Sequence, residues 1–115
     1  MSDDCLFCKI IAGAIPSTEV YRDEDVFAFE DINPAAPIHA LVIPIKHLKD
    51  VAAAEQEDAE LLGKLILAAN KIADEKGLGE EGFRYVINTG SHGGQTVFDL
   101  LLHIIGGRQM SWPPG

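Results

Sequence analysis

Two cysteines and four histidines supply the side chains best suited to metal binding or nucleophilic chemistry in this chain. Cys5 and Cys8 form a C-x-x-C pair, and His47 with either His39 or Asp99 supplies further donors. Zinc prefers thiolate and imidazole ligands in tetrahedral sites, so this set is typical of a zinc centre. A small buried cysteine pair and a redox-active dithiol are the other interpretations of the same spacing. The fourth zinc ligand stays open at this point.

A second polar group lies in an apolar segment near the C-terminus. If residues 97–105 form one strand, Asp99, Leu101 and His103 project from the same face, because side chains alternate along a strand. Asp99 and His103 would then be about 13 Å apart, so a shared catalytic site needs a group from a neighbouring strand. The other interpretation is a core histidine with satisfied hydrogen bonds and an aspartate at the strand end.

The segment between these groups is rich in glycine. Residues 92–96 read HGGQT and enter a predicted strand rather than a helix, so they lack the helix N-terminus of the common phosphate-binding motifs. Backbone N–H groups at such glycines can face an anion, and Gln95 and Thr96 would add donors. A plain turn explains the same residues equally well.

Hydrophobic periodicity predicts the elements that position these residues. Apolar residues recur at three- and four-residue steps over residues 55–76, which predicts one long helix ended by Gly77. A short helix is expected over residues 5–12, and strands over residues 19–22, 26–30, 39–43, 83–88 and 97–105. Short connections favour an α+β fold with a mostly antiparallel sheet, one face of which the long helix covers. The whole chain, residues 1–115, is predicted to form a single domain.

Composition and charge exclude several classes of partner. The chain has 9 Lys and Arg against 18 Asp and Glu, a formal net charge of −9. This charge disfavours nucleic acids and anionic membranes as partners. The longest apolar stretch is far shorter than the roughly 18 residues of a transmembrane helix, and the first residues lack a basic signal-peptide region. We therefore expect a cytoplasmic protein.

Motifs along nearly the whole chain resemble the histidine triad (HIT) family, and within it the Hint branch. The matching stretches are CLFCKII at residues 5–11, IPS at 15–17, FEDINP at 29–34, PIH at 37–39, VIP at 42–44, KH at 46–47, GGQTVF at 93–98, HIIGGRQM at 103–110 and WPPG at 112–115.

The resemblance implies a HIT-like fold and a homodimer in which two five-stranded sheets join into one of ten strands. It implies a purine nucleotide site in each subunit and hydrolysis of nucleoside 5′-phosphoramidates to the monophosphate. In the family motif His-x-His-x-His, the middle histidine attacks the α-phosphorus and forms a nucleotidyl-histidine intermediate. Imidazole suits this role because it is nucleophilic at neutral pH and leaves well when protonated.

This chain departs from the family motif at two of its three histidines. The motif reads Asp99-x-Leu101-x-His103, so leucine stands at the position of the nucleophile. Leucine has no lone pair and cannot form a covalent bond to phosphorus. The family reaction is therefore not expected at this position.

The resemblance assigns roles to the remaining site residues. Asp31 would hold the ribose hydroxyls, Phe29 and Ile32 would line the base pocket, and His39 would support the catalytic strand from its neighbour. The residues around the α-phosphate would be Asn88, Gly94, Gln95, Thr96 and His103. Trp112 would reach toward the partner subunit's site, and zinc would be held by Cys5, Cys8, His47 and Asp99.

Three functions follow from these residues. The first is a nucleotide-binding protein without phosphoramidase activity. The second is an altered or redesigned active site, with Asp99 or Glu30 as a base and His39 or His103 as its partner or as a nucleophile. The third is a dimeric interaction protein that keeps the fold without catalysis.

Overall fold

A computed structural model describes residues 6–115 of the chain. Its helices and strands, in chain order, are α1 (Leu6–Ile11), β1 (Glu19–Arg22), β2 (Val26–Glu30), β3 (Ile38–Pro44), the 3₁₀ turns η1 (Val51–Ala53) and η2 (Gln56–Asp58), α2 (Ala59–Glu75), β4 (Phe83–Val86) and β5 (Leu102–Gly106). Among these residues, no helix has the length and apolar character needed to cross a membrane.

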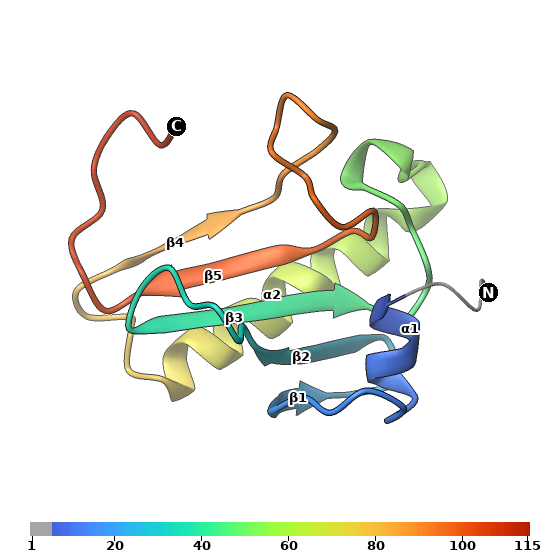
Figure 1. Cartoon of the computed structure of the whole chain (residues 1–115), viewed down its shortest axis with the longest axis horizontal. Helices are drawn as coiled ribbons and strands as arrows, with labels where there is room; N and C mark the ends of the chain where they lie inside the picture. The colour runs from blue at the N-terminus through green and yellow to red at the C-terminus, as the bar shows by residue number, and fades with distance from the viewer. Residues whose placement is uncertain (1–5) are drawn as a thin grey trace.

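The strands form one sheet in the order β1-β2-β3-β5-β4, and each neighbouring pair is antiparallel (Figure 1). In this register Leu41 of β3 lies opposite both Phe29 of β2 and His103 of β5, and His39 lies opposite Ile105. Residues far apart in the sequence are thus brought together on the neighbouring strands β3 and β5. The predicted five-stranded antiparallel sheet with one long and one short helix is confirmed.

The long helix α2 covers one face of the sheet, where the main core lies (Figure 1). Val42, Leu102 and Ile104 point to this face and are fully buried, and they belong to the same cluster as Leu65 and Ile72 of α2. The helix is amphipathic because its apolar residues recur every three or four positions, and this periodicity directs one side of it to the sheet.

The opposite face carries the short helix α1 and the two central histidines. Phe7 and Ile10 of α1 pack in a second apolar cluster with alternate residues of β2 and β3, among them Phe29 and Leu41. Because residues opposite one another in an antiparallel pair share a face, His103 lies on the same side as Leu41. Because α2 covers the other face, as predicted, both histidines lie on the face that α2 leaves open.

Two predicted boundaries are wrong by at least four residues, and the strand predicted over residues 83–88 ends at Val86. The last strand begins at Leu102 rather than at residue 97, because the preceding segment bonds elsewhere: Leu100 N–H donates to the carbonyl of Leu48 at 2.6 Å. Helix α2 begins at Ala59 rather than at residue 55, because residues 56–58 form a 3₁₀ turn in which the Asp58 carboxylate accepts from Glu55 N–H at 2.9 Å. Asp99 and Leu101 therefore lie in a loop and not within the strand.

Candidate functional site

A pocket opens where the loop before β5 meets the ends of β4 and β5. We call it the His103 pocket; its lining residues are Asn88, Gly94, Gln95, Thr96, Val97, Asp99, Leu101 and His103. The structure therefore brings together all five residues expected around a phosphate, together with Asp99 and Leu101. Lysine and arginine are absent from this lining.

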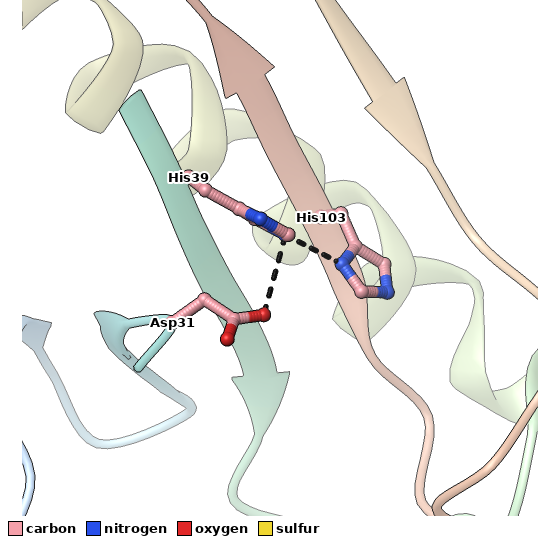
Figure 2. Close-up of side chains that lie close together, drawn as sticks. All are labelled: Asp31, His39 and His103. Carbon is pink, nitrogen blue, oxygen red and sulfur yellow. Dashed lines mark hydrogen bonds and ion pairs between the residues drawn. The ribbon is translucent and has the colours of Figure 1, made fainter. Parts of the chain in front are cut away.

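Figure 2 shows two histidines and an aspartate in contact, and one of them, His103, also lines this pocket. His39 Nε2 lies 2.9 Å from His103 Nδ1 and 3.4 Å from Asp31 Oδ2. The His39 side chain is only 6% exposed, and its other ring nitrogen, Nδ1, accepts a hydrogen bond of 3.0 Å from Ala35 N–H. The ligating atoms of Asp31, His39 and His103 lie within 4.8 Å of one another, a spacing that could hold a metal ion.

The environment of His103 favours the neutral imidazole. Burial lowers the pKa of His103 below its ordinary value of 6.5, the nearby His39 lowers this pKa further, and the Asp31 carboxylate acts in the opposite direction. His103 is therefore uncharged at neutral pH. As a neutral ring it can donate one hydrogen bond and accept another.

A second polar group lies next to the pocket, where Asp99 turns toward His47. The Asp99 carboxylate is 2.8 Å from His47 Nδ1, and the same nitrogen lies 4.0 Å from Cys8 Sγ. Burial raises the pKa of Asp99 above its ordinary value of 3.8, while His47 lowers it. Cys5, the remaining predicted zinc ligand, lies outside the described residues. Cys8, His47 and Asp99 are thus neighbours although residues 9–46 and 48–98 separate them in the sequence.

Gln95 braces the loop that lines the pocket. Its side-chain oxygen accepts from Gly90 N–H at 2.8 Å, and its side-chain nitrogen donates to the carbonyls of Lys49 at 2.7 Å and Val97 at 3.1 Å. Both N–H groups of the amide are therefore engaged with the backbone. Gln95 shapes the pocket, which differs from the direct donor role expected for it.

Other predicted residues lie away from the His103 pocket. Phe29 is 6% exposed and packs edge-on against Phe7 with ring centroids 5.7 Å apart, whereas Ile32 and Trp112 are 89% and 82% exposed. Glu30 forms an ion pair of 3.1 Å with Lys76, the residue directly after α2, and so lies on the opposite face of the sheet. Glu30 cannot act on a ligand in this pocket.

Two residues at the site carry no signal in the sequence. Ala35 contributes through its backbone N–H, which has no side-chain signature. Arg108 donates from Nε and Nη2 to the Ala35 carbonyl at 3.3 and 3.1 Å, a contact across the whole span from the β2–β3 loop to the C-terminal segment. Only the folded arrangement reveals this pair.

Comparisons with known proteins agree with this architecture. The model of the HIT domain family matches residues 12–110. An uncharacterized HIT-like protein of Synechocystis sp. is 52% identical over 115 residues, covering 100% of both chains. The 14 kDa zinc-binding protein of Zea mays is 52% identical over 112 residues, 96% of this chain and 87% of that one. The crystal structure of a HIT family hydrolase from Legionella pneumophila has a TM-score of 0.95 and 49% identity, covering 97% of this chain and 100% of that chain.

Proposed function

Because the chain belongs to the HIT domain family, we propose that it is a Hint-like purine nucleotide-binding protein that does not hydrolyse nucleoside phosphoramidates. One observation carries this proposal: the His103 pocket gathers the residues that would surround a phosphate, and Leu101 forms part of the same wall. The pocket thus combines groups that can bind an anion with an apolar side chain at the position of the family nucleophile.

Hydrogen bonds, rather than charge, would hold the phosphate. Among the lining residues, Asn88 and Thr96 have side-chain donors and Gly94 offers backbone N–H, but none carries a positive charge at neutral pH. Asp99 adds a carboxylate to the lining, and a like charge near a phosphate opposes binding. We therefore expect a modest affinity for nucleoside monophosphates, with the base and ribose contributing through Ile32 and Asp31.

The absence of hydrolysis follows from the side chain of Leu101. Leu101 packs against the apolar cluster that includes Phe29 and Leu41, and it has no atom that can attack phosphorus. Losing an essential nucleophile costs about 10⁶-fold in the rate of a hydrolase. The phosphoramidate would bind, and its P–N bond would stay intact.

The site that includes Cys8, His47 and Asp99 suits zinc. In a tetrahedral zinc site the ligand atoms lie about 3.3–3.6 Å apart, given bond lengths of about 2.0–2.3 Å. His47 Nδ1 lies 4.0 Å from Cys8 Sγ and 2.8 Å from Asp99 Oδ1, which bracket that separation. Cys8 is disulfide-bonded in this structure, and a zinc site would need its reduced thiolate. We propose that in the reduced protein a zinc ion is held by these three residues and Cys5, where it would link the N-terminal segment to the pocket loop.

Zinc content tests this metal site directly. The purified protein should contain about one zinc per chain by elemental mass spectrometry. Cys8→Ser and Asp99→Ala should each lower this content, while His92→Gln, a change in an exposed histidine, should leave it unchanged. A protein that retains no zinc after purification without chelators would contradict the assignment.

A homodimer is the assembly that we propose, by analogy with the family. Strand β4 lies at an edge of the sheet, so its outer backbone groups are open to pairing with a second copy. Trp112 is 82% exposed, as expected for a side chain that reaches a partner. Analytical ultracentrifugation should give twice the chain mass, and a monomer at high micromolar concentration would contradict this proposal.

The altered-active-site hypothesis receives less support. Glu30 lies on the other face of the sheet and pairs with Lys76, while Asp99 pairs with His47. A cytoplasmic protein that only binds partners remains the third hypothesis, and nucleotide titration separates it from the first.

Calorimetric titration with AMP, and with adenosine as the matched ligand that lacks phosphate, tests the proposed function. AMP should bind, and adenosine should bind more weakly. Thr96→Val keeps the side-chain shape but removes the hydroxyl donor, and it should weaken AMP binding by about 2–10-fold, the contribution of one hydrogen bond. No saturable binding of AMP or GMP would overturn the proposal.

A further inference from the structure

The backbone N–H of Ala35 determines the protonation of His39. A backbone amide always donates, so the 3.0 Å contact requires a lone pair on His39 Nδ1. In a neutral imidazole the hydrogen must then be on Nε2. Arg108 holds the Ala35 carbonyl through two N–H groups, at 3.3 and 3.1 Å. This carbonyl belongs to the Ala35–Ala36 peptide, the neighbour of the Pro34–Ala35 peptide whose N–H faces His39, so Arg108 restrains Ala35 from its other side.

The same argument passes from His39 to His103. Their facing nitrogens, Nε2 and Nδ1, are 2.9 Å apart, and one hydrogen occupies the contact. Because His39 supplies it, His103 Nδ1 must be the acceptor, and the hydrogen of the neutral His103 ring is on Nε2. In Figure 2 this second nitrogen of His103 points away from both His39 and Asp31.

We propose that Arg108 and the Ala35 amide act as positioning groups that fix both histidines in the Nε2–H form, so that His103 presents an N–H donor to the pocket. The pocket then selects a ligand group with oxygen acceptors, such as a phosphate. His103 Nε2 has no lone pair in this form, so at neutral pH it neither attacks an electrophile nor removes a proton there. The statement about the ligand rests on the proposed function, whereas the statement about protonation does not.

The proposal also decides what the cluster of Asp31, His39 and His103 does. Their ligating atoms lie close enough to surround a metal ion. A neutral histidine ligates through an unprotonated nitrogen, and His39 Nε2 carries the hydrogen. This arrangement of two histidines and a carboxylate is therefore a hydrogen-bonded relay and not a metal site.

Nuclear magnetic resonance of the ¹⁵N-histidine-labelled protein without ligand measures the protonation directly. Long-range ¹H–¹⁵N correlation at pH 7.5 should show protonated Nε2 and unprotonated Nδ1 in both His39 and His103. A through-hydrogen-bond coupling should join His39 Nε2 to His103 Nδ1. A protonated Nδ1 in either ring would overturn the proposal, whatever the result of AMP titration.

Variants at Ala35 test the origin of this protonation. Ala35→Pro removes the N–H and should introduce the Nδ1–H form of His39, with AMP binding weakened by about 2–10-fold. Ala35→Ser keeps the N–H, and its side chain is exposed, so both readouts should stay as in the parent. Unchanged protonation of His39 in a folded Ala35→Pro protein would overturn the proposal.

Arg108 provides an independent perturbation outside the pocket, should Ala35→Pro fail to fold. Arg108→Leu should shift the same histidine resonances, and Arg108→Lys, which keeps a cationic donor but not the two-nitrogen contact, should restore them in part. Addition of Co²⁺ to a Cys8→Ser protein should broaden the resonances of neither His39 nor His103, because no ring nitrogen of the relay has a lone pair available to a metal ion. Selective broadening of both sets of resonances would overturn the relay. If both histidines are protonated at Nε2 as proposed but AMP does not bind, only the proposed function is overturned.

Discussion

Gly93 leaves room for a backbone contact that any side chain would disturb, and this gives a graded test of the pocket loop. A Cβ at Gly93 would lie 2.4 Å from the Thr89 carbonyl oxygen and 2.8 Å from the Thr89 nitrogen. Ordinary contact begins at 3.4 Å, so Gly93→Ala must displace the backbone by about 1 Å. Because both neighbours are backbone atoms, a rotamer change cannot relieve the clash.

The expected size of the effect follows from this displacement. Overpacking of this kind costs about 1–3 kcal/mol. For a chain of 115 residues, the entropy of unfolding converts a loss of 1 kcal/mol in the free energy of unfolding into a decrease of about 4 °C in Tm. Gly93→Ala should therefore lower Tm by about 4–12 °C. Gly94, Gln95 and Thr96 move with the loop, and AMP binding should fall by about 10-fold or more, the contribution of one or two hydrogen bonds.

Gly63→Ala is the matched control, because it makes the same chemical change where nothing lies within 4 Å. Gly63 is an exposed residue of α2, and alanine there should stabilise the protein by about 0.5–1 kcal/mol and raise Tm by about 2–4 °C. Calorimetry gives Tm, and titration with AMP gives the affinity. A Gly93→Ala protein with the Tm and AMP affinity of the parent would refute the reasoning about this loop.

Three further predictions concern the pH dependence and the core. Because the pKa of His103 is lowered on folding, the free energy of unfolding should decrease as pH falls below 6.5 toward the lower folded-state pKa, and His103→Gln should flatten this part of the profile. The hydrogen bond from Lys46 lowers the pKa of Asp58. The stability that this bond contributes is therefore present above pH 3.8 and is lost as pH falls through the lower folded-state pKa. The acid unfolding profile of Asp58→Asn should lack this loss of stability. A Cβ at Gly106 would lie 2.7 Å from Leu78 Cδ2, so Gly106→Ala should lower the free energy of unfolding by about 1–3 kcal/mol. In a Leu78→Ala background this cost should be at least about 1 kcal/mol smaller. Additive costs of the two substitutions in urea unfolding would contradict the contact.

Hydrophobic periodicity was sufficient to predict the sheet and α2. The repeat of apolar residues in α2 is long enough to be read without tertiary information, and the apolar runs of β2 and β3, bounded by turn residues, are typical of buried strands. The segment before β5 is different, because residues 97–101 are as apolar and extended in character as a strand. Hydrogen bonds from Leu100 to Leu48 and from Gln95 to Lys49 take this segment away from the sheet, and such long-range contacts have no local signature.

The candidate site divides in the same way. Side chains named by family motifs, such as Asn88, Thr96 and His103, gather in one pocket. The groups that set hydrogen positions could not be predicted, because Ala35 acts through its backbone and Arg108 reaches it from 73 residues away. A motif identifies which residues meet, whereas the folded structure determines which atom donates.

Hydrolysis of adenosine 5′-phosphoramidate tests the central claim most directly, with the parent and Leu101→His proteins compared in one assay. AMP release is followed by chromatography, and acid-quenched samples are weighed by intact-protein mass spectrometry for a nucleotidyl adduct. We predict neither AMP nor adduct from the parent, and both from Leu101→His. Turnover and an adduct in the parent would show that another residue performs the attack and would contradict the account.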